Sequence, residues 1–415
     1  MSTGLEPAPH ARGILSEQLA GRRKTILKLP YMWRAAVLAA ASCAAAPAGD
    51  TTLGGFLVTN NDLSPPFVNT ATFYAVNPDG TLGRKTNVET GGSGIEGGFF
   101  AAARVIAMPN GSDACVYVSN AWDNDIAGID AMTRTLTGVF LGSPTDSGTT
   151  NGIGLAANSQ YLYATYTAST TIATFQVQAG CTLSFVGDVF AAGLNGGVVD
   201  GMAIHGEIMV IAYGDGSIES FDISGGLPVS NGDQQYSTGS SDDHLPNGVL
   251  ITQDGHYAIF GDASTRTTVE VSDISSGALS PTIAYALGTG WNSGNVRLSP
   301  DEKVLFVTND SSGQVTAAFF DSTTGKVVPG CTSNRLKDFY TNFAYAGNVG
   351  LQLATGAGGA IYVPEFAAGG TVLIGILDLT VSGAACTLTE SVNSPVSDPA
   401  ALSFLLSIAV YPQSP

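Results

Sequence analysis

The chain has 415 residues, of which 44% are apolar and only 12% charged, and its formal net charge is −18. Such an acidic surface repels phosphate backbones and anionic lipid, which excludes nucleic acid and membrane surfaces as expected partners. The 52 glycines, and the lack of a long apolar face of 3.6-residue period after residue 50, favour an all-β fold of short strands and tight turns.

Residues 1–48 are predicted to form an export signal with a basic N-terminal extension. The basic residues at positions 22–34 lead into the apolar run "AAVLAAASCAAA" and then Ala46-Pro47-Ala48, whose small residues suit a cleavage site near Gly49. "RRKTILK" partly resembles a twin-arginine signal. Cleavage would leave ten basic and 32 acidic residues, about −22 in net charge, on a secreted or periplasmic protein. The alternative is a disordered basic tail.

Residues 49–415 are predicted to form one seven-bladed β-propeller. Seven apolar stretches recur, each as the second strand of a four-stranded repeat: "GFLVTN" (55–60), "CVYVSN" (115–120), "YLYATY" (161–166), "IMVIAY" (208–213), "YAIFGD" (257–262), "VLFVTN" (304–309) and "AIYVPE" (360–365). The cleaved chain divided by seven gives about 52 residues, which is the size of one propeller blade.

The last apolar segment, "ALSFLLSIAVYP" at 401–412, is predicted to close the ring. The first repeat begins directly at its second strand and lacks an inner one. Residues 401–412 would supply this strand and remove two exposed sheet edges. We therefore expect burial of the apolar side chains Ala401, Phe404, Leu406, Ile408 and Val410.

Four cysteines remain after the predicted cleavage, an even number that permits disulfides in an exported protein. Three share one context, "AGCTL", "PGCTS" and "AACTL". Equivalent points on separate repeats are expected to lie too far apart to bridge. Cys115 with Cys181 and Cys331 with Cys386 join neighbouring repeats and are the pairings to test.

"LSPDEKVLFVTND" and "TQDGHYAIFGD", together with the set of YVTN-like repeats, resemble the lactonase family of seven-bladed propellers. This family includes 6-phosphogluconolactonase-like and carboxymuconate lactonizing enzymes. The resemblance implies hydrolysis of a sugar or related lactone at the mouth of the central channel. Asp262 matches a family aspartate, and Asp310 keeps one acidic position.

The family typically has His-x-His at the entry to the fifth blade and Pro-Arg-His at the entry to the sixth. The corresponding positions here carry Leu245 and Asn247, and then Ser293, Gly294 and Asn295. The histidines and the arginine are therefore not kept, although His244 lies one place from the first histidine.

Hydrolysis of a lactone without a metal needs a base for water and a positive group or hydrogen-bond donor for the oxyanion. The candidate bases are Asp310 and Asp200, and the candidate positive groups are His244 and Arg297. Further mouth residues are expected to contact substrate: Glu96, Asp242, Asp243, Asn247, Asn295 and Trp291.

The Asn-Gly pairs near the starts of inner strands allow two interpretations. They are explained by turn chemistry, because Asn tolerates left-handed backbone and Gly relieves crowding at the channel axis. Alternatively they form a ring of oxygens that suits sugar hydroxyls or a hard cation such as calcium, with Asp200, Asn151 and Asn348 as ligands.

Two functions therefore fit the sequence. One is an exported lactonase-like hydrolase, and the other is a non-catalytic propeller that binds a cation, a glycan or a protein partner. We expect a monomer whose partner is a small-molecule lactone or a glycan.

Overall fold

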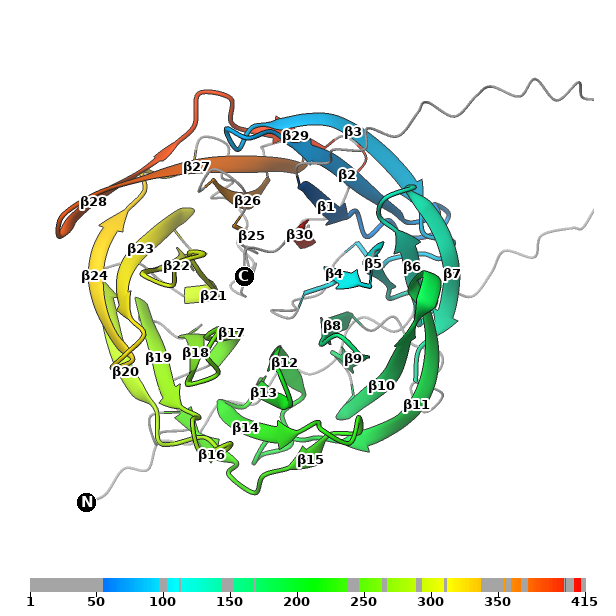
Figure 1. Cartoon of the computed structure of the whole chain (residues 1–415), viewed down its shortest axis with the longest axis horizontal. Coiled ribbons are helices and arrows are strands. Elements are labelled where there is room, and N and C mark those ends of the chain that lie inside the picture. The colour runs from blue at the N-terminus through cyan, green and yellow to red at the C-terminus, as the bar shows by residue number, and fades with distance from the viewer. Residues whose placement is uncertain are drawn as a thin grey trace, which may run out of the picture. The chain divides into compact units, whose positions relative to one another are not determined.

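The structure is a computed structural model that describes residues 55–96, 103–111, 113–143, 152–167, 169–237, 246–262, 267–288, 293–309, 312–336, 354–355, 360–366, 372–398, 400 and 407–411. These residues form seven antiparallel sheets around a central channel, which confirms the predicted seven-bladed propeller (Figure 1). The helical structure within the described ranges is a single 3₁₀ turn, η1 (Ala179–Cys181). No helix in these ranges is long and apolar enough to cross a membrane.

Each blade runs from inner strand A at the channel to outer strand D at the rim. The first blade is β30 (Ser407–Tyr411), β1 (Phe56–Asn60), β2 (Thr70–Val76) and β3 (Leu82–Glu89). The second is β4 (Val105–Asn110), β5 (Asp113–Asn120), β6 (Asp125–Asp130) and β7 (Thr135–Leu141). The third is β8 (Ile153–Ala157), β9 (Tyr161–Tyr166), β10 (Thr171–Gln178) and β11 (Thr182–Phe190).

The remaining four blades follow the same order, with a divided edge in two of them. The fourth is β12 (Val199–His205), β13 (Ile208–Tyr213), β14 (Ser217–Asp222) and the two short pieces β15 (Val229–Ser230) and β16 (Gln235–Tyr236). The fifth is β17 (Pro246–Ile251), β18 (Tyr257–Asp262), β19 (Thr267–Asp273) and β20 (Ile283–Gly288). The sixth is β21 (Ser293–Leu298), β22 (Val304–Asn309), β23 (Gln314–Asp321) and β24 (Lys326–Thr332). The seventh is β25 (Ala354–Thr355), β26 (Ile361–Phe366), β27 (Val372–Ser382) and β28 (Ala385–Glu390), with β29 (Val396–Ser397) paired to β27.

The second strand of every blade lies within two residues of its predicted position at each end. These strands read as continuous apolar runs because both of their faces are buried. In β1, Leu57 points into the core shared with the seventh blade, whereas Phe56 and Val58 point into the core shared with the second. Seven such apolar clusters each join two neighbouring blades.

The predicted closure of the ring is confirmed by β30, which pairs antiparallel with β1 from Phe56↔Tyr411 to Asn60↔Ser407. Ile408 and Val410 are buried in the core between the first and seventh blades, and Ala409 in the core between the first and second. The other residues predicted to be buried here, Ala401, Phe404 and Leu406, lie outside the described residues.

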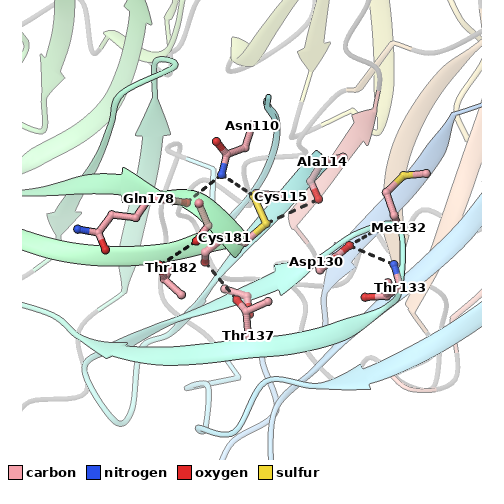
Figure 2. Close-up of a disulfide and its surroundings, with 12 residues drawn as sticks. Asn110, Ala114, Cys115, Asp130, Met132, Thr133, Thr137, Gln178, Cys181 and Thr182 are labelled. Atoms are coloured by element: carbon pink, nitrogen blue, oxygen red, sulfur yellow. Dashed lines mark hydrogen bonds between the residues drawn. A yellow bond between two sulfur atoms is a disulfide. The ribbon is translucent and has the colours of Figure 1, made fainter. Parts of the chain in front are cut away.

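Both proposed disulfides are present, Cys115–Cys181 (Figure 2) and Cys331–Cys386. The first closes a loop of 66 residues and the second a loop of 55 residues. Each lowers the conformational entropy of the unfolded chain and thereby stabilises the folded protein by about 4 kcal/mol.

The shared sequence context of Cys331 and Cys386 does not mark equivalent positions in the two blades. Cys386 lies near the start of β28, but Cys331 lies near the end of β24, so the two positions are not equivalent. Their Cα atoms are 5.5 Å apart, because the outer strands of neighbouring blades pass close to each other.

Deletion of residues 400–415 is expected to make the protein insoluble or aggregated. It removes β30, exposes the edge of β1 and takes apolar side chains from two inter-blade cores. Solubility, size-exclusion chromatography and thermal unfolding measure this. The matched control, deletion of residues 412–415 alone, retains β30 and should behave as wild type. A soluble, monomeric 400–415 deletion with the wild-type melting temperature would contradict closure by β30.

Candidate functional site

The loops that join strands B to C and strands D to A meet at one end of the channel, here called the mouth. The Trp122 N–H donates to the Ser93 carbonyl at 3.0 Å, and the Glu96 N–H donates to the Asp62 carbonyl at 3.0 Å. Both hydrogen bonds join a D–A loop to a B–C loop. The A–B hairpin turns lie at the other end, here called the turn end.

Three of the predicted site residues lie near the starts of three consecutive inner strands, at the mouth. These residues, here called the inner-strand arc, are Asp200 in β12, Asn247 in β17 and Asn295 in β21. In all three strands the register with strand B shifts at this point, between Val199 and Gly201 in the first of them. The chain therefore bulges at each arc residue, and its side chain departs from the regular alternation along the strand.

Glycine is required beside the arc because neighbouring inner strands touch there. A Cβ atom at Gly201 would lie 1.8 Å from the Asn247 carbonyl oxygen, and one at Gly248 would lie 2.5 Å from the Gly294 carbonyl oxygen. The predicted role of glycine in relieving crowding at the channel axis is confirmed. The predicted turn conformation is wrong for Asn247 and Asn295, which lie within strands at bulges. The glycines permit close approach of two backbones.

Three of the four polar atoms of the two arc amides are buried without a hydrogen-bond partner in the described part of the chain. Asn247 is 1% exposed and Asn295 is 3% exposed. Neither Oδ1 nor Nδ2 of Asn247 has a partner among the described residues, and Nδ2 of Asn295 has none either. Buried polar groups are satisfied in the great majority of native structures, so these amide groups are candidates for contacts with a ligand.

Asp200 is the titratable member of the arc. Burial raises the pKa of its carboxyl from the ordinary value of 3.8 to about 7. The carboxyl can therefore gain or release a proton near neutral pH, which is the property that a general base or acid needs.

The other predicted site residues do not join the arc. Glu96 belongs to the first D–A loop, where its Oε1 accepts the Ser64 N–H at 3.1 Å. Seven further candidates lie outside the described residues: Asp310, His244, Asp242, Asp243, Trp291, Asn151 and Asn348. No group of three or more His, Cys, Asp or Glu side chains within the described ranges could hold a metal ion. Calcium binding through Asp200, Asn151 and Asn348 stays a prediction.

Arg297 lies deeper in the channel than the arc. Arg297 lies in β21 and pairs with Phe306 of β22, as Ala203 of β12 pairs with the equivalent Val210 of β13. Arg297 is therefore at the level of Ala203, which lies three residues beyond Asp200. At about 3.3 Å per residue along a strand, this places its backbone roughly 10 Å further toward the turn end. The structure thus separates Arg297 from Asp200 along the channel.

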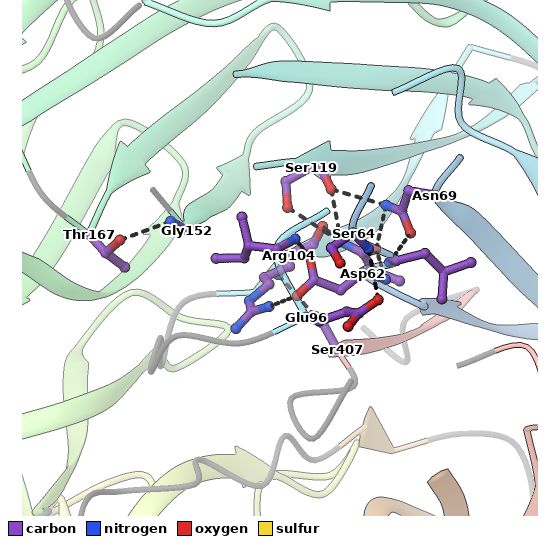
Figure 3. A network of polar contacts seen from close by, with 12 residues as sticks. Asp62, Ser64, Asn69, Glu96, Arg104, Ser119, Gly152, Thr167 and Ser407 are labelled. Atoms are coloured by element: carbon purple, nitrogen blue, oxygen red, sulfur yellow. Dashed lines mark hydrogen bonds and ion pairs between the residues drawn. The ribbon is translucent and has the colours of Figure 1, made fainter. Parts of the chain in front are cut away.

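The mouth also contains a buried ion pair that the sequence does not predict. The Arg104 Nη1 lies 2.6 Å from Asp62 Oδ2, and both side chains are almost fully buried (Figure 3). The Arg104 N–H donates to Ser407 Oγ at 2.9 Å, which ties the second blade to β30. Asp62 lies in the left-handed region, with a φ of 53°. Arg104 is 42 residues away in the sequence, so no local motif predicts that the two side chains pair.

The same polar network continues through asparagine side chains of the first two blades. Asn69 Nδ2 donates to Asn60 Oδ1 at 2.9 Å and to Asn120 Oδ1 at 3.0 Å. Asn120 in turn donates to Asp125 at 2.7 Å, and burial raises the pKa of that carboxyl to about 6. These groups satisfy one another, unlike the amides of the inner-strand arc, and their role is to hold the loops of the mouth.

Three solved structures share the propeller fold at low sequence identity. A "putative 6-phosphogluconolactonase" from Bacteroides fragilis is 14% identical with a TM-score of 0.61, covering 87% of this chain and 98% of its own. Another "putative 6-phosphogluconolactonase", from Bacteroides uniformis, is 11% identical with a TM-score of 0.60, covering 85% and 99%. A protein from Lactobacillus plantarum is 13% identical with a TM-score of 0.58, covering 86% and 98%. No family model and no curated protein matches the chain. At these identities the likeness establishes the fold alone.

The substitution Arg104→Met is expected to destabilise the protein by about 3–5 kcal/mol, because it leaves the buried Asp62 carboxylate without its cation. Denaturant unfolding measures the loss. Arg84→Met, at an exposed position of β3, is the matched control and should change stability by less than about 0.5 kcal/mol. The double variant Asp62→Asn/Arg104→Met should recover part of the loss. Equal stability of the two single variants would contradict the structural role of this pair.

The stability of the wild type relative to Asp200→Asn is expected to fall as the pH rises from 4 to 8. The folded protein binds the Asp200 proton more tightly than the unfolded chain does, because the pKa is raised from 3.8 to about 7. The stability gained from this tighter proton binding is therefore fully present below pH 3.8, the pKa of Asp200 in the unfolded chain. It is lost as the pH rises through about 7, the pKa in the folded protein. Thermal unfolding across this range measures the difference. Burial also raises the pKa of Asp125, but Asp125 is present in both proteins, so its effect on stability cancels in the comparison. Parallel curves of melting temperature against pH for the two proteins would contradict the raised pKa of Asp200.

Proposed function

We propose that this protein is an exported lactonase-like hydrolase that opens a sugar or related lactone at the mouth of its channel. The observation that carries the proposal is the inner-strand arc, which combines a carboxyl of pKa about 7 with buried amide groups that lack acceptors among the described residues. The family resemblance of the repeats and the shared fold of the two Bacteroides structures support the same activity. Export rests on the basic and apolar pattern of residues 22–48.

In the proposed reaction the Asp200 carboxylate takes a proton from water, and the resulting hydroxide attacks the lactone carbonyl carbon. The carbonyl oxygen becomes an oxyanion, which accepts hydrogen bonds from the Nδ2 groups of Asn247 and Asn295. Collapse of the tetrahedral intermediate breaks the ring C–O bond. Asp200 then returns its proton to the departing alkoxide, so that the product is a hydroxy acid and the enzyme is unchanged.

The amides take the place that positive side chains hold in the family motif. Side-chain amides serve as oxyanion donors in other enzymes, and a donor in a water-poor site stabilises developing charge more strongly than one in water. Asn247 stands within the family motif itself, at one of the positions where a histidine is replaced. Asn295 stands at the corresponding point of the next blade's motif.

Purified protein is expected to accelerate lactone opening, followed by acid release with a pH indicator and corrected for spontaneous hydrolysis. A panel of δ- and γ-sugar lactones covers the proposed substrate class. Asp200→Asn should lower kcat/KM by about 10²–10⁴-fold, and Asn295→Ala by about 10²–10³-fold. Activity should rise with pH through about 7, as Asp200 loses its proton.

Asp222→Asn, at an exposed carboxylate of β14, is the matched control and should retain wild-type activity. His244→Ala and Asp310→Ala complete the panel, because the sequence places both at the mouth. Background rates for wild type and all variants would refute the hydrolase. The binding alternative would then gain support from a rise in melting temperature with calcium or sugars, since a ligand of the native state must stabilise it.

A further inference from the structure

The central channel encloses a cavity at its turn end, separate from the inner-strand arc. Its volume is about 580 Å³, which lies in the range of pockets that hold small organic ligands. Inner strands of six blades line it: β4, β8, β12, β17, β21 and β30. The A–B turns form its rim, which includes Asn158, Gln253 and Glu302.

One level of this cavity carries a single charge in an apolar ring. Strand pairing places six lining residues at the same register on their inner strands, each opposite the equivalent residue of strand B: Ile106, Ala156, Ala203, Leu250, Arg297 and Ala409. Five of the six are apolar. Arg297 is therefore the one cation at this level among the described lining residues.

Arg297 has no anionic partner within the described residues. Its Nη1 donates to the Val296 carbonyl at 3.1 Å, and no described carboxylate lies within 4 Å of the guanidinium. The carboxylate on the rim, Glu302, accepts a hydrogen bond from the Gln253 N–H at 2.7 Å. A half-buried guanidinium without a counter-charge is unfavourable. The chain has a net charge of −18 and so is rich in carboxylates, yet none of the described ones pairs with Arg297.

We propose that this cavity binds a small organic monocarboxylate, with its carboxylate on Arg297 and its apolar body against Ile106, Leu250 and Ala409. A planar guanidinium can bind one carboxylate through two parallel hydrogen bonds, so a single arginine suffices. A phosphate would carry more charge than one arginine neutralises, and the apolar wall offers it no further donors. The site is additional to lactone hydrolysis at the arc and does not depend on it.

The test uses hexanoate and its neutral analogue hexanamide as probes, with calorimetric titration and thermal unfolding of the intact protein. Hexanoate should bind saturably and raise the melting temperature, whereas hexanamide should bind roughly 10- to 100-fold more weakly, because it lacks the charge-assisted hydrogen bonds. Arg297→Met should abolish this preference for the acid. Arg84→Met removes an exposed arginine elsewhere and should bind hexanoate as wild type does.

Arg297→Lys provides a second variant that keeps the charge and disturbs the fold less. It should bind hexanoate more weakly than wild type, yet still prefer it to hexanamide. The proposal is overturned if wild type does not bind hexanoate, if it binds hexanamide equally well, or if Arg297→Met keeps the preference. All measurements record binding, so their outcome is independent of lactone turnover.

Discussion

The pairing of β30 with β1 is the interaction on which the rest of the propeller depends. A four-stranded blade buries its two faces only against neighbouring blades, so an open ring leaves two faces and two edges in water. β30 supplies the inner strand of the first blade from the other end of the described chain, and its side chains enter two inter-blade cores. Because β30 also forms part of the channel wall, the cavity that contains Arg297 exists only in the closed ring.

Closure of the ring also sets the surroundings of the two arginines near the channel, Arg104 and Arg297. Ser407 of β30 accepts the Arg104 N–H, and the Arg104 guanidinium is neutralised by Asp62, so this cation is unavailable to a ligand. Arg297 lies in the channel with apolar neighbours at its level. Two arginines of the same acidic chain thus have different chemistry, because one faces a buried carboxylate and the other faces a cavity.

The mouth and the turn end of the channel differ for a related reason. At the mouth, glycines and bulges let neighbouring inner strands approach until their backbones touch, which buries the arc amides and desolvates Asp200. Toward the turn end the inner strands pair regularly and line the cavity that contains Arg297. One fold therefore places a carboxyl of raised pKa and an apolar cavity with a guanidinium at different levels along the same axis.

The sequence by itself determined the propeller, the positions of the second strands and the two cysteine pairs, because repeat period, apolar runs and chain adjacency are local properties. It also named Asp200, Asn247 and Asn295. Only the tertiary structure showed that the Asn-Gly pairs lie at bulges, that Cys331 and Cys386 are not equivalent, and that Arg104 pairs with Asp62. These features depend on strand register and on contacts between distant segments, where a shift of one residue exchanges the faces of a strand. The depth of Arg297 in the channel was decided in the same way, because register, and not sequence spacing, sets the level of each inner-strand side chain.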